Sequence, residues 1–333
     1  MNLFPQLNTL ILCTTLVACG GGGTDTATTA VAATDSPATS TASTTTGTST
    51  SASTTGNATA TTTPSAAVAC ALSYSALNTS LNLTSTSRWT CGTTRLLTAN
   101  GIPDHASTGG SFATPVSVQN ISVSMPLAPA VAATVTPLNK TAIGYVLNGV
   151  KLDPQTDGSC ASSATSTANG AGCVAAGGRD PWVLEAIGGA FLFGTDTSNA
   201  HVQPNGQYHY HGMPEGYLTQ VNKGAAMTLV GFAVDGFPIY ARYGYSIAGN
   251  AGSAIKTITS SYQKKTTADA GRPSTAIFPM GTFTSDYQYV ASSGDLDECN
   301  GRTGVTPEYP AGTYHYYITD TFPYAQRCIK GSR

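Results

Sequence analysis

The segment from Thr24 to Ala67 limits which part of this chain can fold. It consists almost wholly of Thr, Ser, Ala and Gly, contains no aromatic residue, and is charged only at Asp25 and Asp35. Such a segment cannot bury enough apolar surface to offset the entropy that a chain loses on folding. We therefore expect a flexible linker over residues 19–68 and one folded domain over residues 69–333.

An apolar stretch, Leu7–Ala18, precedes this linker and ends in small residues. This pattern is typical of a signal peptide, here residues 1–18. The sequence Leu16-Val17-Ala18-Cys19 resembles a bacterial lipobox, which implies that Cys19 becomes the lipidated first residue of the mature protein. The resemblance predicts an exported lipoprotein, attached to the outer membrane by its lipid and facing the periplasm or the cell surface. The alternative is an ordinary secreted protein, because the segment before residue 7 has no Lys or Arg.

The charge balance and the length of the apolar runs each argue against one class of protein. Charged residues make up 10% of the chain and the net charge is −2. A nucleic-acid-binding protein needs a basic surface, so nucleic acid is not an expected partner. No apolar run reaches about 18 residues, so a bundle of membrane-spanning helices is not expected either. The sequence does not identify a protein or small-molecule partner.

The cysteines predict a disulfide-linked domain. Of the eight cysteines, Cys13 is removed with the signal peptide and Cys19 is assigned to the lipid. An even number then remains in an exported chain, which favours disulfides. Fifteen pairings of six cysteines are possible, and we favour the pairing of sequence neighbours. These pairs are Cys70–Cys91, Cys160–Cys173 and Cys299–Cys328.

The remaining pattern predicts a mainly β, β-rich domain with long loops and few short helices. Short apolar or alternating runs between turn signals indicate strands. These runs are Val116–Val123, Thr141–Leu147, Thr228–Val234 and Tyr287–Ala291. Four dipeptides predict turns: Asn148-Gly149, Asp157-Gly158, Asn205-Gly206 and Asp235-Gly236. A short helix is an alternative over Trp182–Leu192, although two consecutive glycines disfavour it.

The most informative segment contains three of the five histidines. If Tyr208–His211 is a strand, its two-residue period places His209 and His211 on one face. A turn at residues 204–206 would bring His201 near this pair. Imidazole is the commonest metal ligand, so the convergence predicts a site for copper or zinc. The alternative is that these histidines form hydrogen bonds inside a Tyr-rich core.

Two other residues are candidates to complete the metal site. His105 lies in a Gly-rich loop of the type that often carries ligands. Glu185 stands in an otherwise apolar run, where a buried carboxylate needs a partner. Glu185 could therefore be a ligand, a general base or an acceptor for a histidine N–H. Met213 and the surrounding tyrosines make copper conceivable, since a thioether suits that metal.

A partial internal repeat surrounds the histidine motif. The segments Asp196–His201 and Gly206–His211 are similar to Asp297–Arg302 and Gly312–Tyr317. In the second copy Arg302 replaces His201 and Tyr317 replaces His211, so that only His315 is retained. The motif could be architectural. If it is a site, the first copy holds the metal, and the second copy has lost it or binds an anion through Arg302. Chance similarity is a third interpretation.

These residues resemble those of a bacterial family, the YHYH-domain proteins, which share the tetrad Tyr208–His211. The resemblance covers nearly all of residues 95–330. It extends over Asn100–His105, Leu147–Val150, Trp182–Ala186, Asn199–Pro204, Asp235–Tyr240 and Asp295–Arg302. It implies that residues 69–333 form a YHYH domain, and it implies no particular reaction.

Three functions follow as hypotheses. The first is an extracytoplasmic metalloprotein whose copper or zinc is held by His201, His209 and His211, with His105 or Glu185 completing the site. The second is a metal-independent hydrolase or lyase with a histidine base. The third is a surface adhesion or glycan-binding module with tyrosines as a stacking surface.

Overall fold

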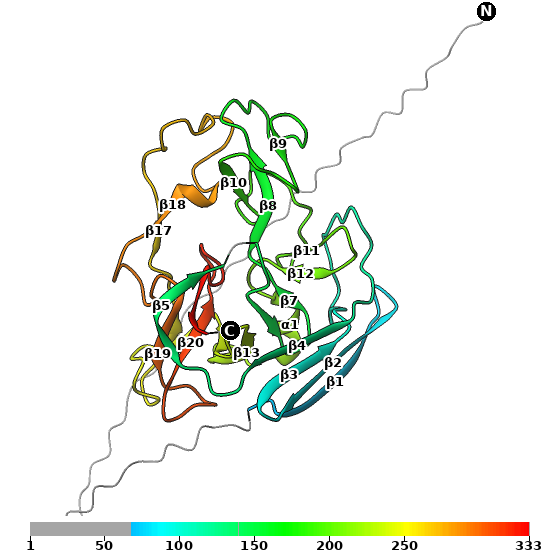
Figure 1. Ribbon diagram of the computed structural model, residues 1–333, viewed down its shortest axis with the longest axis vertical. Helices are drawn as coiled ribbons and strands as arrows, with labels where there is room; N and C mark the ends of the chain where they lie inside the picture. Colours follow the sequence, from blue (N-terminus) through cyan, green and yellow to red (C-terminus); the bar gives the residue numbers. More distant parts are fainter. Residues whose placement is uncertain (1–67, 139, 333) are drawn as a thin grey trace, which may run out of the picture. The chain divides into compact units, whose positions relative to one another are not determined.

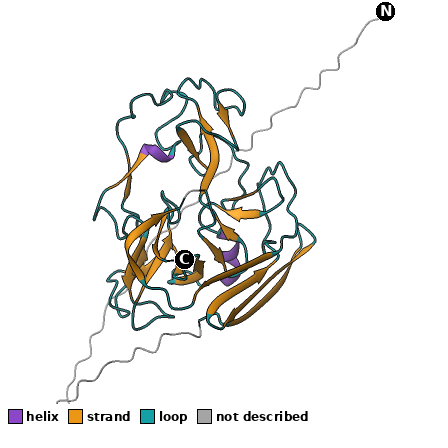
Figure 2. Cartoon of the chain, viewed as in Figure 1, coloured by secondary structure: helices purple, strands orange, loops and turns teal. Residues whose placement is uncertain are grey.

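The computed structural model describes residues 68–138 and 140–332 of the chain (Figure 1). The predicted signal peptide, Cys19 and nearly all of the predicted linker lie outside these residues. Strands and loops dominate the described part, and helix is scarce (Figure 2). The described helical elements are α1 (Glu215–Val221) and the 3-10 helix η1 (Thr284–Asp286). The prediction of a mainly β fold with few short helices is therefore confirmed. None of the helices in the described ranges is long and apolar enough to span a membrane.

The largest element is an eight-stranded sheet with the order β11-β12-β7-β6-β13-β14-β20-β19. In that order its strands are Ala200–Val202, Tyr208–Tyr210, Lys151–Leu152, Gly144–Val146, Thr228–Ala233, Pro238–Ala241, Thr313–Ile318 and Gly301–Gly304. The sheet is mixed. β12 runs parallel to β7, β14 runs parallel to β20, and the other neighbours are antiparallel.

This sheet consists of two similar halves. Each half contains two hairpins, β6–β7 with β11–β12 in the first half and β13–β14 with β19–β20 in the second. In each half the second strands of the two hairpins run parallel to each other. The halves meet where β6 pairs with β13, with Tyr145 opposite Phe232 at the centre. Pairing continues symmetrically from this point, with Gly144 opposite Ala233 and Gly231 opposite Val146. The two halves are therefore related by an approximate twofold axis through the sheet.

The sequence explains the junction. Ile143–Leu152 and Val230–Ile239 align without a gap, and both have Gly at their second and seventh positions. A Cβ on Gly144 would lie 2.6 Å from the Phe232 carbonyl oxygen, and one on Gly231 would lie 2.1 Å from that of Tyr145. Only glycine therefore allows the two central strands to approach this closely. The internal repeat thus extends beyond the segment that the sequence had indicated.

The two faces of the sheet bury different cores. Tyr208, Tyr210, Tyr314 and Tyr316 project into one apolar cluster, together with Val146 and other aliphatic residues. The opposite face carries Tyr145, Phe232, Tyr240 and Tyr317, which belong to a second cluster. This alternation follows from the two-residue period of the strands.

A second, four-stranded antiparallel sheet packs against the centre of the second face. Its strands are β1 (Ala71–Asn78), β2 (Leu83–Cys91), β3 (Thr94–Ala99) and β4 (Ile121–Pro126). The ring of Trp89 lies 5.6 Å from that of Phe232, and its Nε1–H donates to the Leu147 carbonyl at 3.0 Å. The guanidinium of Arg95 stacks over Phe232 at 3.7 Å.

Shorter strands complete the fold. A three-stranded sheet has the order β10 (Trp182–Glu185), β8 (Gln155–Cys160) and β9 (Cys173–Val174). Three pairs are formed by β15 (Tyr243–Tyr245) with β16 (Ile255–Thr257), β17 (Tyr262–Lys264) with β18 (Tyr287–Tyr289), and β21 (Cys328–Gly331) with β5 (Val131–Pro137).

Disulfides join Cys70 to Cys91, Cys160 to Cys173 and Cys299 to Cys328. These are the sequence-neighbour pairs that we expected.

The structure corrects three local expectations. The run Val116–Val123 is a strand only from Ile121, where β4 begins. The alternative of a helix from Trp182, which two glycines disfavoured, does not hold, because this segment pairs with β8 as strand β10. Asp157-Gly158 lies inside β8 and is no turn. The three Gly residues of the other predicted turns, at positions 149, 206 and 236, have φ between +82° and +89°, whereas Gly158 has no positive φ. A dipeptide alone does not reveal this difference.

Candidate metal centre

The histidines of the motif converge as predicted. β11 and β12 form an antiparallel hairpin in which His201 lies directly opposite His209. His211 follows β12 and lies on the same face as His209, two residues further along. The three ring centroids are 4.6–4.7 Å apart, and one ligand atom from each residue lies within 4.8 Å of the others. One ion could therefore contact all three imidazoles. We call these residues the histidine triad.

A tight turn sets this hairpin. Gly206 donates its N–H to the Gln203 carbonyl at 2.8 Å, and its φ of +82° suits glycine. The Asn205 side chain accepts the Gln207 N–H at 3.1 Å. At the far end, His211 N–H donates to the Asn199 carbonyl at 2.8 Å, which fixes the backbone of the third histidine.

Backbone carbonyls fix the tautomer of each ring. The Nδ1 atoms of His201, His209 and His211 lie 3.0, 3.4 and 3.3 Å from the carbonyl oxygens of Phe193, Gln207 and Pro154. A carbonyl only accepts hydrogen bonds, so each Nδ1 carries the proton and each Nε2 presents a lone pair. Metal-binding histidines in proteins are commonly oriented in this way.

The triad is buried and uncharged. His209 and His211 are 2% and 1% exposed, and His201 is half-buried. Burial lowers the pKa of His201 and holds the pKa values of His209 and His211 well below their usual range. The neighbouring imidazoles and the Lys151 ammonium lower the pKa values of His209 and His211 further. Neutral imidazole is the form that binds a metal.

We expect the metal-free protein to lose stability as the pH falls below about 6.5, the ordinary histidine value in an unfolded chain. The folded state keeps His209 and His211 neutral, so below that pH the unfolded state binds more protons. The free energy of unfolding should fall by about 1.4 kcal/mol per pH unit for each such histidine. Urea denaturation at pH 7.5 and 5.5 measures this loss. His209→Gln/His211→Gln should show a smaller pH dependence, and an equal dependence would contradict the expectation.

A lysine–aspartate pair lies beside the triad. Lys151 is the lateral neighbour of His209 in the parallel pair β7–β12, so the two side chains share a face. Asp153 follows two residues later on that face. The Lys151 ammonium donates to Asp153 Oδ2 at 3.0 Å and to Gln203 at 3.1 Å. Neither residue was predicted from the sequence, because no local pattern connects Lys151 or Asp153 with the histidine motif.

The structure does not bring His105 or Glu185 into the triad. His105 lies behind the sheet, where its Nε2 contacts the Tyr210 hydroxyl at 2.7 Å. Glu185 is buried and forms an ion pair with Arg327, with N–O distances of 2.8 and 3.2 Å. Among the described residues, the cluster able to hold a metal consists of the three histidines of the motif. The expectation that His105 or Glu185 completes the site is therefore not supported.

The tyrosines of the tetrad have a structural role. The Tyr208 hydroxyl donates to Asp196 at 2.6 Å, and the Tyr210 hydroxyl accepts from Asn148 at 3.1 Å. Both rings are fully buried in the core opposite the triad. The two tyrosines hold one face of strand β12 in the core, while the histidines project from its other face.

The second half of the sheet repeats this framework without the triad. Tyr314 donates to Asp297 at 3.0 Å and Tyr316 donates to Asp235 at 2.6 Å. Asp297 and Asp235 occupy the positions of Asp196 and Asn148. The duplication proposed from the sequence is therefore structural, and the tyrosines belong to the part that both halves share.

At the three histidine positions the second half carries Arg302, His315 and Tyr317. Arg302 lies opposite His315, as His201 lies opposite His209. Its guanidinium donates to the Tyr317 hydroxyl at 3.2 Å and to the Tyr245 carbonyl at 2.8 Å. His315 Nδ1 lies 3.1 Å from the Thr313 carbonyl, which reproduces the carbonyl contact of His209.

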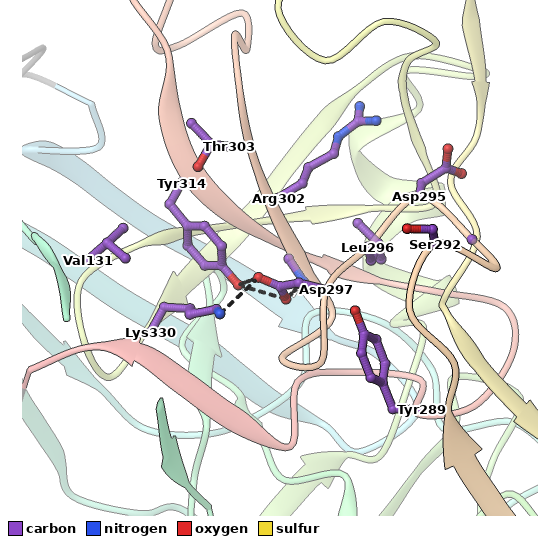
Figure 3. A pocket seen from close by; sticks show the side chains of 12 residues that line it. Val131, Tyr289, Ser292, Asp295, Leu296, Asp297, Arg302, Thr303, Tyr314 and Lys330 are labelled. Carbon is purple, nitrogen blue, oxygen red and sulfur yellow. Dashed lines mark hydrogen bonds and ion pairs between the residues drawn. The ribbon is translucent and has the colours of Figure 1, made fainter. Parts of the chain in front are cut away.

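A surface pocket of about 430 Å³ adjoins this second half (Figure 3). Tyr314 and Lys330 both point toward Asp297 at its centre, and Arg302 points away from them. Asp297 pairs with Lys330 at 3.5 Å, and Asp295 pairs with Lys256 at 2.7 Å. These acidic groups are thus already paired within the protein, and the pocket contains none of the triad.

Fold and site together define a disulfide-linked, β-rich protein with a duplicated sheet and a buried three-histidine cluster. The family model described as YHYH protein matches residues 122–331, and the chain belongs to this family. The match spans all eight strands of the duplicated sheet. No curated protein and no solved structure matches the chain.

Proposed function

We propose that this protein binds one copper or zinc ion through His201, His209 and His211. The observation that carries the proposal is His211 Nε2, a buried nitrogen that has no hydrogen-bond partner among the described residues. A buried polar atom without a partner destabilises a fold unless something satisfies it. A metal ion would coordinate this lone pair and those of the two neighbouring rings.

The ligand chemistry limits the metal. Three neutral imidazoles suit zinc and copper(II), whereas calcium and magnesium prefer oxygen ligands. Three protein ligands leave a further coordination position, as in catalytic zinc sites. Met213, which had made copper conceivable, belongs to the apolar core.

We further propose that the protein acts outside the cytoplasm, held at the outer membrane through a lipid on Cys19. Three disulfides in the described part support an oxidising compartment. Labelling cells with a radioactive fatty acid tests the anchor. Cys19→Ser should abolish incorporation, and equal labelling of this variant would overturn the assignment.

The metal proposal predicts one ion per chain. Protein purified without a histidine tag, stripped with chelator and reconstituted with copper or zinc, should contain about one equivalent by mass spectrometry of the metal. His209→Ala/His211→Ala should contain less than about a tenth of that, because only one imidazole remains.

His315→Ala is the matched control, since it removes an equally buried histidine with the same carbonyl contact. It should retain the full metal content. Negligible metal in both the wild type and the double variant would end the proposal and favour a metal-independent function.

A further inference from the structure

The two halves of the duplicated sheet can be compared with each other, because only the first carries the triad. Features present in both halves maintain the architecture, because the second half keeps them without the triad. They include the central glycines, the buried tyrosine pairs and the aspartates that accept hydrogen bonds from the tyrosine hydroxyls. Features confined to the first half are candidates for the function of the triad.

Lys151 and Asp153 are confined to the first half. The pairing of β7 with β12 and of β14 with β20 places Pro238 at the position of Lys151 and Tyr240 at that of Asp153. The Tyr240 hydroxyl donates to the Glu308 carboxylate at 2.8 Å and lies 2.7 Å from the Thr306 hydroxyl. The second half of the sheet therefore lacks both the lysine–aspartate pair and two of the three histidines.

Asp153 is held with one oxygen unsatisfied. Its side chain is buried, and Oδ2 accepts a hydrogen bond from Lys151. Oδ1 is also buried but has no partner within the described part of the chain. The Asp153 N–H donates to the Tyr210 carbonyl at 2.9 Å, which places this residue beside His211. Two buried acceptors, His211 Nε2 and Asp153 Oδ1, thus lack partners in one small region.

We infer that Asp153 accepts a hydrogen bond from a water molecule held at the open position of the metal in the triad. This inference rests on the proposed metal site. The ion would satisfy His211 Nε2, and its water would satisfy Asp153 Oδ1, so one hydrated ion accounts for both unsatisfied atoms. Lys151 positions Asp153 through the other carboxylate oxygen. Asp153 is accordingly a positioning residue for this water molecule.

The test uses the cobalt(II)-loaded protein, whose visible spectrum reports on the ligands of the metal, with azide as the probe. Cobalt content is measured first. Azide must displace the water, and the Asp153 carboxylate repels this anion. Asp153→Asn should therefore bind azide about tenfold more tightly than the wild type. Lys151→Met removes a nearby cation and should bind azide about tenfold more weakly.

The opposite signs distinguish this role from a structural one, which would not move azide affinity in two directions. Asp157→Asn, at an exposed aspartate paired with Lys140, is the matched control and should leave azide affinity unchanged. If Asp153→Asn or Lys151→Met holds its full cobalt content and binds azide with wild-type affinity, the inference about Asp153 is wrong, while the proposed metal site still stands. If one variant does not fold, the other decides. A wild type that holds no cobalt and no other metal would instead overturn the proposed function.

Discussion

We expect Glu185→Ala to lower the free energy of unfolding by about 3–5 kcal/mol, the usual cost of leaving one partner of a buried ion pair alone. The side chains of Glu185 and Arg327 are only 2% and 9% exposed. Glu185 also accepts a hydrogen bond from Thr284, and Arg327 stacks over Phe322 at 4.9 Å. The variant would leave a guanidinium buried without its counter-ion. Urea denaturation at pH 7.5 measures the loss.

The same variant separates the structural role of Glu185 from a role as ligand. If Glu185 only balances Arg327, reconstituted Glu185→Ala that remains folded should hold one metal ion per chain. Lys140→Ala breaks the exposed pair with Asp157 and should cost at most about 1 kcal/mol. A Glu185→Ala protein of wild-type stability that has lost its metal would show that the carboxylate is a ligand.

The sequence predicted those features that depend on local periodicity. Alternation along Tyr208–His211 places both histidines on one face in any strand, and the Asn205-Gly206 turn brings His201 opposite His209. The disulfides were predictable for a related reason, since neighbours in the chain have short loops to close.

The site residues that were misplaced or missed depend on contacts between distant segments. His105 could be proposed as a ligand because no local pattern shows which side of the sheet its loop approaches. It reaches Tyr210, whose side chain points away from the triad. Lys151 and Asp153 escaped notice because about 50 residues separate them from the triad, and only the parallel pairing of β7 with β12 brings them close. Parallel neighbours cannot be joined by a tight turn and require a connection of about a dozen residues or more.

We expect Arg302→His/Tyr317→His to create a second metal site, which would raise the metal content from about one to about two ions per chain. The backbone framework for a triad is already present. Arg302 lies opposite His315, and the Tyr317 N–H donates to the Asn300 carbonyl at 2.9 Å, as His211 does to Asn199. His315 Nδ1 already faces the Thr313 carbonyl, so its Nε2 is the free nitrogen once the Tyr317 hydroxyl is removed.

In the native protein a guanidinium and a hydroxyl occupy the space that the second ion would take. The Arg302 guanidinium contacts the Tyr317 hydroxyl, which in turn lies 3.3 Å from His315 Nε2. Removing both side chains frees the lone pair and adds two imidazoles. The new site should be weaker than the first, because it lacks the lysine–aspartate pair. Arg302→His alone should stay at one ion, since Tyr317 still blocks His315. A folded double variant that also holds one ion would show that the shared framework is insufficient to build the site.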